Sequence, residues 1–63
     1  MFCYAVFYGS KQVRVFAYNS QGDDWKRAEA LAVDMARKAK GNGYAYTVEH
    51  FGVSGVGCVV STD

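Results

Sequence analysis

Hydrophobic and polar positions follow a period of two near both ends of the chain and a helical period in the middle. This pattern predicts five elements in the order strand, strand, helix, strand, strand, over residues 2–8, 12–18, 23–40, 44–51 and 56–61. A single amphipathic helix between two strand pairs can bury its apolar side only against a sheet. The chain is therefore expected to form one α+β domain over residues 1–63, a two-layer ββαββ fold with an antiparallel sheet and the helix packed on one face.

The first two strands are joined by Gly9-Ser10, a dipeptide suited to a type II′ hairpin turn. Pairing Tyr8 with Lys11 sets the register, and the register divides the side chains between two faces. The face expected to contact the core carries Phe2, Tyr4, Val6, Val13, Val15 and Ala17. The other face carries Cys3, Ala5, Phe7, Arg14, Phe16 and Tyr18. This second face is more apolar than a solvated sheet face usually is.

The predicted helix has an apolar stripe made mostly of small residues. At helical spacing, one side carries Trp25, Ala28, Leu31, Ala32, Met35, Ala36 and Ala39. Because most of these residues are alanine, the helix backbone can approach the sheet closely. Trp25, Leu31 and Met35 are expected to fill the wider gaps.

Both ends of this helix carry terminal signals. Ser20 and Asp23 are alternative N-caps, and the sequence favours neither. Gly41 is expected to end the helix in a left-handed conformation. Asp34 is expected to pair with Lys38 one turn later.

The last two strands differ in strength. Residues 44–51 alternate regularly, which predicts a half-buried strand with Glu49 facing outward. Residues 56–61 are β-branched around Cys58 but contain Gly57, which is typical of a weaker strand at a sheet edge. Two facings of this last strand stay open, because a one-residue slip in the preceding turn inverts it.

Composition restricts the classes of function without choosing one. The 63 residues are 51% hydrophobic and carry a formal net charge of +1, so no strong long-range field attracts nucleic acid or anionic lipid. No apolar run reaches the length of a membrane span, and the N-terminal residues do not resemble a signal peptide. These features predict a cytoplasmic protein. Cys3 and Cys58 are expected to be buried free thiols, with a disulfide between neighbouring strands as the alternative.

No reactive residue lies in a recognisable catalytic pattern. His50 is the only histidine, and no motif places a nucleophile beside it. Asp23 and Asp24 are explained by their position at the start of a helix. Gly41-Asn42-Gly43 follows a helix and does not precede one, so it presents the wrong end of the helix dipole to a phosphate group. We expect no catalytic residue, no cofactor and no metal site, and therefore not an enzyme.

The second face of the sheet is the candidate site. Its proposed partner-binding residues are Phe7, Arg14, Phe16, Tyr18 and Phe51. Aromatic side chains beside an arginine are enriched in the centres of protein interfaces, which favours a protein partner or a homodimer through this face. The alternatives are a face covered by another segment, a register that differs by one residue, and a nucleic-acid platform in which bases stack on these rings. That platform would use a local basic edge formed by Lys11, Arg14, Lys26, Arg27, Arg37, Lys38 and Lys40.

Several short motifs resemble one family. They are Glu29-Ala30-Leu31 within the helix, Gly43-Tyr44 leading to Tyr46-Thr47, and the late Cys58-Val59. In this order of elements they resemble the small host-RNA-polymerase inhibitors of T-odd podophages. The acidic strip and paired arginines of that family are not matched, so the resemblance implies a class and not a site. It implies a phage or mobile-element protein that binds a host protein in the bacterial cytoplasm and inhibits or redirects it.

Overall fold

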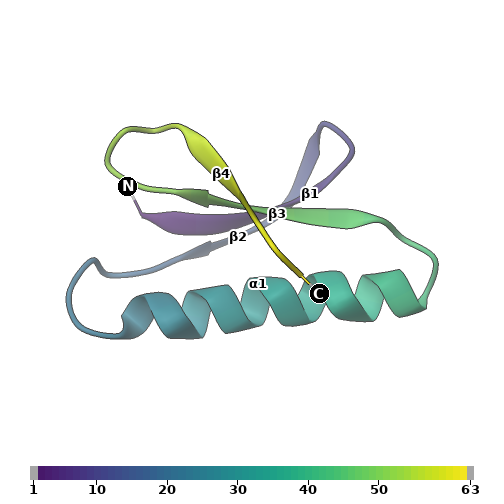
Figure 1. Ribbon diagram of the computed structural model, residues 1–63, viewed down its shortest axis with the longest axis horizontal. Helices are drawn as coiled ribbons and strands as arrows, with labels where there is room; N and C mark the ends of the chain where they lie inside the picture. Colours follow the sequence, from purple (N-terminus) through teal and green to yellow (C-terminus); the bar gives the residue numbers. More distant parts are fainter. Residues whose placement is uncertain (1, 63) are drawn as a thin grey trace.

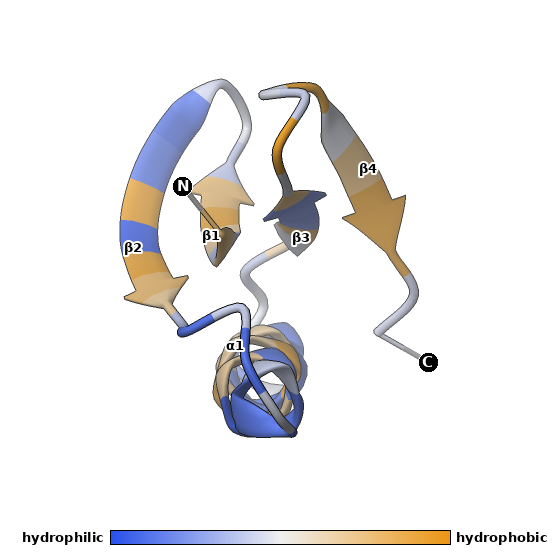
Figure 2. Cartoon of the chain, turned by 90° about the vertical axis from the view of Figure 1, so that its left-hand side faces the viewer, coloured by the Kyte–Doolittle hydropathy of each residue, from blue (hydrophilic) through white to orange (hydrophobic). Residues whose placement is uncertain are grey.

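The computed structural model describes residues 2–62 and shows one four-stranded antiparallel sheet with one helix (Figure 1). The elements are β1 (Cys3–Tyr8), β2 (Lys11–Ala17), α1 (Asp24–Gly41), β3 (Tyr46–Phe51) and β4 (Gly57–Val60). The strand order is β2-β1-β3-β4, so the two hairpins lie side by side and the first and third strands are central. The predicted two-layer ββαββ fold is confirmed, with α1 on one side of the sheet (Figure 2).

The register of the first hairpin differs from the prediction. Gly9 has φ +65°, as the first central residue of a type II′ turn requires, and Tyr8 lies opposite Lys11 as expected. A β-bulge then places Val13 as an extra residue, so Val6 faces Arg14 and Tyr4 faces Phe16. Beyond the bulge, every side chain of β2 is on the opposite face from the predicted one.

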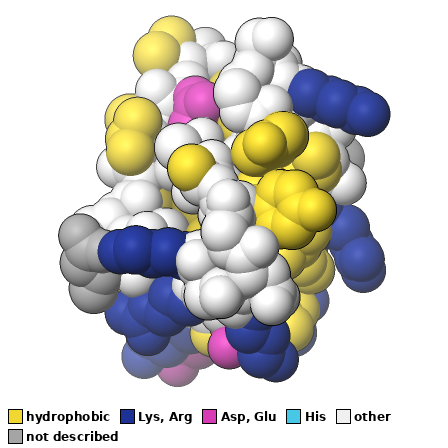
Figure 3. Space-filling view, turned by 90° about the vertical axis from the view of Figure 1, so that its right-hand side faces the viewer, with side chains coloured by type: hydrophobic (Ala, Val, Ile, Leu, Met, Phe, Trp, Pro, Cys, Tyr) yellow, Lys and Arg dark blue, Asp and Glu magenta, His cyan; other side chains and the backbone are white. Residues whose placement is uncertain are grey.

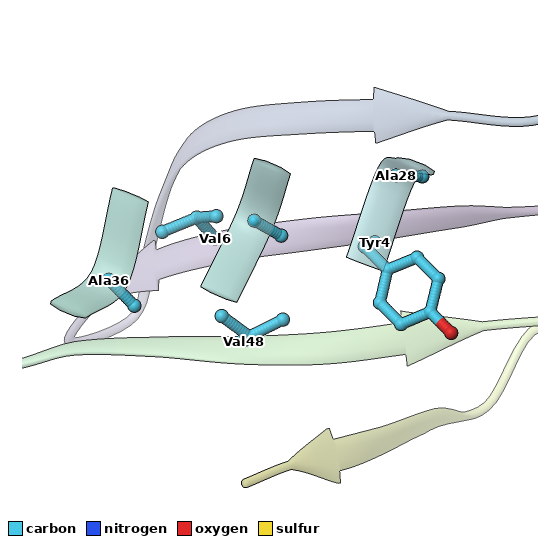
Figure 4. Close-up of a cluster of buried hydrophobic side chains, with 6 residues drawn as sticks. Tyr4, Val6, Ala28, Ala36 and Val48 are labelled. Carbon is cyan, nitrogen blue, oxygen red and sulfur yellow. The ribbon is translucent and has the colours of Figure 1, made fainter. Parts of the chain in front are cut away.

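The core lies between α1 and the two central strands. Its largest fully buried side chains are Val6 and Val48, and Tyr4 lies beside them (Figure 4). Three alanines of α1 complete the cluster, namely Ala28, Ala32 and Ala36. Because alanine has only one side-chain carbon, α1 lies close to the sheet, as the sequence predicted.

The larger side chains of the predicted helix stripe do not fill this layer. Trp25 is 39% exposed and Leu31 is 44% exposed, so the expectation that both fill gaps in the core is wrong. Met35 does pack against the core cluster. The three buried alanines are spaced four residues apart, and this row rotates Leu31 away from the sheet.

The helix begins after Asp23, which occupies the N-cap position without a side-chain capping bond. Asp24 instead accepts hydrogen bonds from Arg27 Nε (3.0 Å) and from the backbone N–H of Asn19 (2.8 Å), and these bonds lower the pKa of its carboxyl group. The predicted Asp34–Lys38 ion pair is present at 3.0 Å.

The expected left-handed stop at Gly41 is wrong. Gly41 is the last helical residue, and the positive φ of +88° belongs to Gly43. The helix therefore continues through Gly41, and the chain reverses direction two residues later.

The last hairpin places β4 at the edge of the sheet, as predicted. β3 separates β4 from β1, and both cysteines are free, so a disulfide between neighbouring strands is excluded. Cys3 is buried as expected, whereas Cys58 is exposed. Glu49 faces away from α1, as predicted, because its neighbour Val48 faces the core.

The part of the chain that the structure describes contains no helix with the length and hydropathy of a membrane span.

Candidate functional site

The structure divides the five predicted site residues between the two faces of the sheet. Phe7 and Phe51 lie on the face away from α1, as expected. Phe16 and Tyr18 pack against the core cluster on the side of α1. Arg14 also lies on that side, opposite Val6. The bulge at Val13 causes this division, so the placement of Arg14, Phe16 and Tyr18 on the outer face is corrected.

No helix or strand of residues 2–62 covers the face away from α1, and we call it the open sheet face (Figure 2). The cross-strand pairs place on it Cys3, Ala5, Phe7, Gln12, Val15, Ala17, Thr47, Glu49, Phe51, Gly57 and Val59. Cys3 and Ala5 are buried although no helix covers them. The rings of Phe7 and Phe51 are half-buried and in contact, with centroids 6.4 Å apart. This face therefore has a tightly packed centre and exposed aliphatic side chains around it.

Gly57 is required by the packing of this face. It lies opposite Phe51, and a Cβ atom built on Gly57 would contact two carbons of the Phe51 ring at 2.9 and 3.0 Å and would overlap the Glu49 carboxylate. The Phe51 ring therefore lies over the backbone of β4. This close approach explains the glycine that interrupts the β-branched run.

A shallow hollow of about 320 Å³ opens at one end of the open sheet face. It is lined by Cys3, Ala5, Gln12, Phe51, Gly52, Val53 and Gly55. Most of these groups are apolar, and Cys3 is largely buried, at 9% exposure. Such a hollow suits an apolar side chain of a partner, because it offers few polar groups to bind a polar ligand.

A cluster of stacked rings lies on the other face, beside the start of α1. Tyr4 and His50 stack with centroids 4.6 Å apart, and Tyr18 stacks on His50 at 5.9 Å. The Tyr18 hydroxyl and His50 Nε2 are hydrogen-bonded at 2.6 Å. The stacking and the hydrogen bond give His50 a structural role in this cluster, with its Nε2 atom satisfied by Tyr18.

Tyr4 is the most perturbed titratable group of this cluster. Its hydroxyl donates to Glu29 Oε2 at 3.2 Å. Burial, and then the negative charge of Glu29, raise the pKa of Tyr4 to about 12. The perturbation therefore has a structural cause, namely burial and the contact with Glu29. The side-chain hydrogen bonds of Tyr4 and His50 within residues 2–62 are with Glu29 and Tyr18, and no cysteine, serine or threonine takes part in them.

Three tyrosines form a second cluster where α1 ends. Tyr8 contacts Tyr44 and Tyr46 with centroids 5.8 and 5.6 Å away. Tyr8 and Tyr44 are about half exposed, at 48% and 51%. Figure 3 shows this end of the molecule, with a patch of hydrophobic side chains edged by Lys and Arg side chains. The sequence pattern did not predict the cluster, because Tyr44 and Tyr46 come from a different hairpin than Tyr8.

Arg14 and Phe16 form a separate pair near the outer edge of β2. The guanidinium carbon of Arg14 lies 5.2 Å from the centre of the Phe16 ring, which is within cation–π distance. This contact occupies one face of the Phe16 ring. Neither residue contributes to the open sheet face.

Among residues 2–62, no group of three or more His, Cys, Asp and Glu side chains could hold a metal ion. Comparisons with known proteins give no family either: no family model, no curated protein and no solved structure matches the chain. The surfaces described above are therefore the basis for a proposal about function.

Proposed function

We propose that this chain is a small non-enzymatic binding module whose partner is another protein, held on the open sheet face. The observation that carries the proposal is that one face of the sheet is mostly apolar and that no helix or strand of residues 2–62 covers it. Val15 and Val59 are 38% and 79% exposed on this face, around a centre formed by Phe7 and Phe51. Exposed apolar surface of this kind is typical of protein interaction sites.

The layout of the open sheet face supports a protein partner more than a small ligand. Aromatic side chains within an apolar patch are typical of the central part of a protein interface. The adjoining hollow is shallow and can accept one apolar side chain of the partner. Glu49 supplies the charged group of the open sheet face, so a partner with a basic group opposite Glu49 would be favoured.

The proposed mode of action rests on the small size of the domain and on the resemblance of its sequence motifs to phage-encoded inhibitors. A domain of 63 residues can cover a site on a larger protein by stoichiometric binding. The resemblance to phage-encoded inhibitors favours a bacterial host protein as the partner, with inhibition or redirection of that protein in the host cytoplasm as the outcome. This part of the proposal rests on analogy with a class.

Affinity capture with matched variants tests the proposal. The tagged chain would be incubated with nuclease-treated bacterial lysate, in parallel with Val15→Glu and Leu31→Glu. Val15 and Leu31 have similar exposure, 38% and 44%, but lie on opposite sides of the molecule. We expect the wild type and Leu31→Glu to retain one host protein at 1:1 stoichiometry, and we expect Val15→Glu to lose it. Retention unaffected by Val15→Glu would contradict binding on the open sheet face.

Nucleic-acid binding is the second candidate, and the tyrosine cluster favours it. Tyr8 and Tyr44 present exposed rings on which bases can stack. Lys11 lies opposite Tyr8, and α1 ends nearby with Lys38 and Lys40 in its last turn. This location differs from the sheet platform expected from the sequence, since the aromatic residues Phe16 and Tyr18 pack against the core.

Fluorescence anisotropy with a labelled single-stranded oligonucleotide distinguishes this second candidate. Binding that weakens between low and moderate salt and is reduced by Tyr44→Ala would support it. Val53→Ala is the matched control, because Val53 is exposed but lies outside the tyrosine cluster. An affinity equal in wild type and Tyr44→Ala would exclude the tyrosine cluster as the binding site.

A further inference from the structure

The two edges of the sheet are protected to very different degrees. β2, at one edge, carries the charged residues Lys11 and Arg14 and a β-bulge at Val13. Charged side chains and bulges are the features by which natural sheets prevent pairing with another strand. β4, at the other edge, has none of them, and its sequence is Gly-Cys-Val-Val.

The segment around β4 is also uncharged over an unusual length. From His50 to Thr62 the chain contains no Asp, Glu, Lys or Arg. Among the described residues, the three most exposed large hydrophobic side chains all lie in this segment: Val53 at 83%, Val59 at 79% and Val56 at 66%. Of these three, Val59 lies within β4 itself, and an exposed β-branched side chain on an open edge favours addition of a further strand.

β4 is held in place but is not covered. It pairs with β3 on one side only, and α1 lies against β1, β2 and β3 but not against β4 (Figure 2). After the strand, Arg37 Nε donates a hydrogen bond to the backbone oxygen of Thr62 at 2.7 Å, which fixes the following segment to α1. The free backbone groups along the outer side of β4 are therefore presented in a fixed, extended conformation.

We propose that β4 pairs with β4 of a second copy of this chain, antiparallel about a two-fold axis, so that the two sheets become one. The uncharged segment argues for a second copy as the occupant. Two identical neutral strands meet without like-charge repulsion, whereas a charged partner segment would find no opposite charge along β4. The pairing is isologous, so each copy uses the same patch.

The protected edge limits the assembly to a dimer. Once β4 is paired, the remaining edge of each copy is β2, where Lys11, Arg14 and the bulge oppose further addition. The dimer would join the two open sheet faces into one broader surface. This inference does not depend on the proposed function, because it concerns the purified chain alone.

Sedimentation velocity over a range of loading concentrations, from about 5 to about 500 µM, tests the pairing. A short edge strand buries little area, so we expect a concentration-dependent dimer and no larger species. Val59→Lys places like charges beside the two-fold axis and should weaken the dimer about tenfold or more. Val53→Lys, which alters an equally exposed residue in the preceding turn, and Val15→Glu, on the distant part of the open sheet face, should leave the dimer intact.

Cross-linking supplies a second readout. For a pairing centred on Cys58 or Val59, the two Cys58 Cα atoms would lie about 5–8 Å apart, within reach of a short bismaleimide. Covalent dimer should form in the wild type and be absent from Cys58→Ser, which retains only the buried Cys3. A monomer at every concentration would overturn the proposal. A dimer that resists Val59→Lys, or that is lost with Val15→Glu, would also overturn it, because the contact would then lie away from β4.

Discussion

Gly57→Ala tests whether the open sheet face is packed as described. The Cβ atom of alanine at this position would lie 2.9 and 3.0 Å from two carbons of the Phe51 ring, whereas ordinary contacts begin at 3.4 Å. The Glu49 carboxylate can rotate away, but the Phe51 ring is held against Phe7 with centroids 6.4 Å apart. The ring must therefore shift by several tenths of an ångström together with its neighbour.

The change that Gly57→Ala makes to the free energy of unfolding is the sum of two opposing effects. Overpacking of this kind costs about 1–3 kcal/mol of the free energy of unfolding. Replacing glycine by alanine in a strand returns about 0.5–1 kcal/mol, because the unfolded chain loses conformational freedom. We expect a net loss of about 1–2 kcal/mol, which lowers the Tm of a domain of this size by roughly 5–15 °C.

Urea unfolding followed by circular dichroism, at one fixed protein concentration, measures this loss. Gly52→Ala is the matched control. A Cβ atom on Gly52 would meet only a carbon of Phe2 at 4.0 Å, and Gly52 has no positive φ. This control should be neutral or stabilising by about 0.4–1 kcal/mol. If Gly57→Ala is as stable as the wild type or as Gly52→Ala, the close packing of Phe51 over β4 is refuted.

Two further predictions concern the core and its tyrosine. Val48→Ala should lower the free energy of unfolding by about 2 kcal/mol, because Val48 is fully buried. Trp25 is 39% exposed, so Trp25→Ala should cost less than the about 3–5 kcal/mol of a buried tryptophan. A loss of about 3 kcal/mol or more for Trp25→Ala in urea unfolding would contradict this. The raised pKa of Tyr4, about 12 against 10.0, means that the unfolded chain loses this proton first as pH rises. The contribution of Tyr4 to the free energy of unfolding is therefore fully present below pH 10.0 and is lost as pH rises through about 12. If Tyr4→Phe has the same pH dependence of stability as the wild type, Tyr4 is excluded as its cause.

The order of elements and the fold could be read from the sequence because each signal was local. Gly9-Ser10 predicted the turn, and the alternation through Val48 and Glu49 predicted which side of β3 faces the core. The row of alanines predicted a helix lying close to the sheet. Each of these signals depends on residues only a few positions apart.

The candidate site could be predicted only in part, because its geometry depends on one non-local feature. The bulge at Val13 exchanges the faces of Arg14, Phe16 and Tyr18, and no glycine marks it in the sequence. The end of the helix was also missed at Gly41, because the positive φ that reverses the chain belongs to Gly43, where the N–H groups of Gly43 and Tyr44 donate to Lys40 and Ala39 carbonyls.

The two ring clusters could not be predicted for the same reason. Each joins residues from strands that become neighbours only in the sheet, as with Tyr8 of β1 and Tyr46 of β3. The exposed valines around β4 are different, since their uncharged segment is visible in the sequence. Their significance required the strand order, which showed that β4 lies at an open edge.

Site-specific photo-crosslinking tests the central claim most directly. A benzophenone side chain would replace Val15 on the open sheet face in one protein and Leu31 on α1 in another, and both would be irradiated in nuclease-treated bacterial lysate. We expect one host protein to be joined covalently to the chain from position 15 and not from position 31. Cross-linking of that protein from position 31 alone, or of no protein from position 15, would contradict the open sheet face as the partner-binding surface.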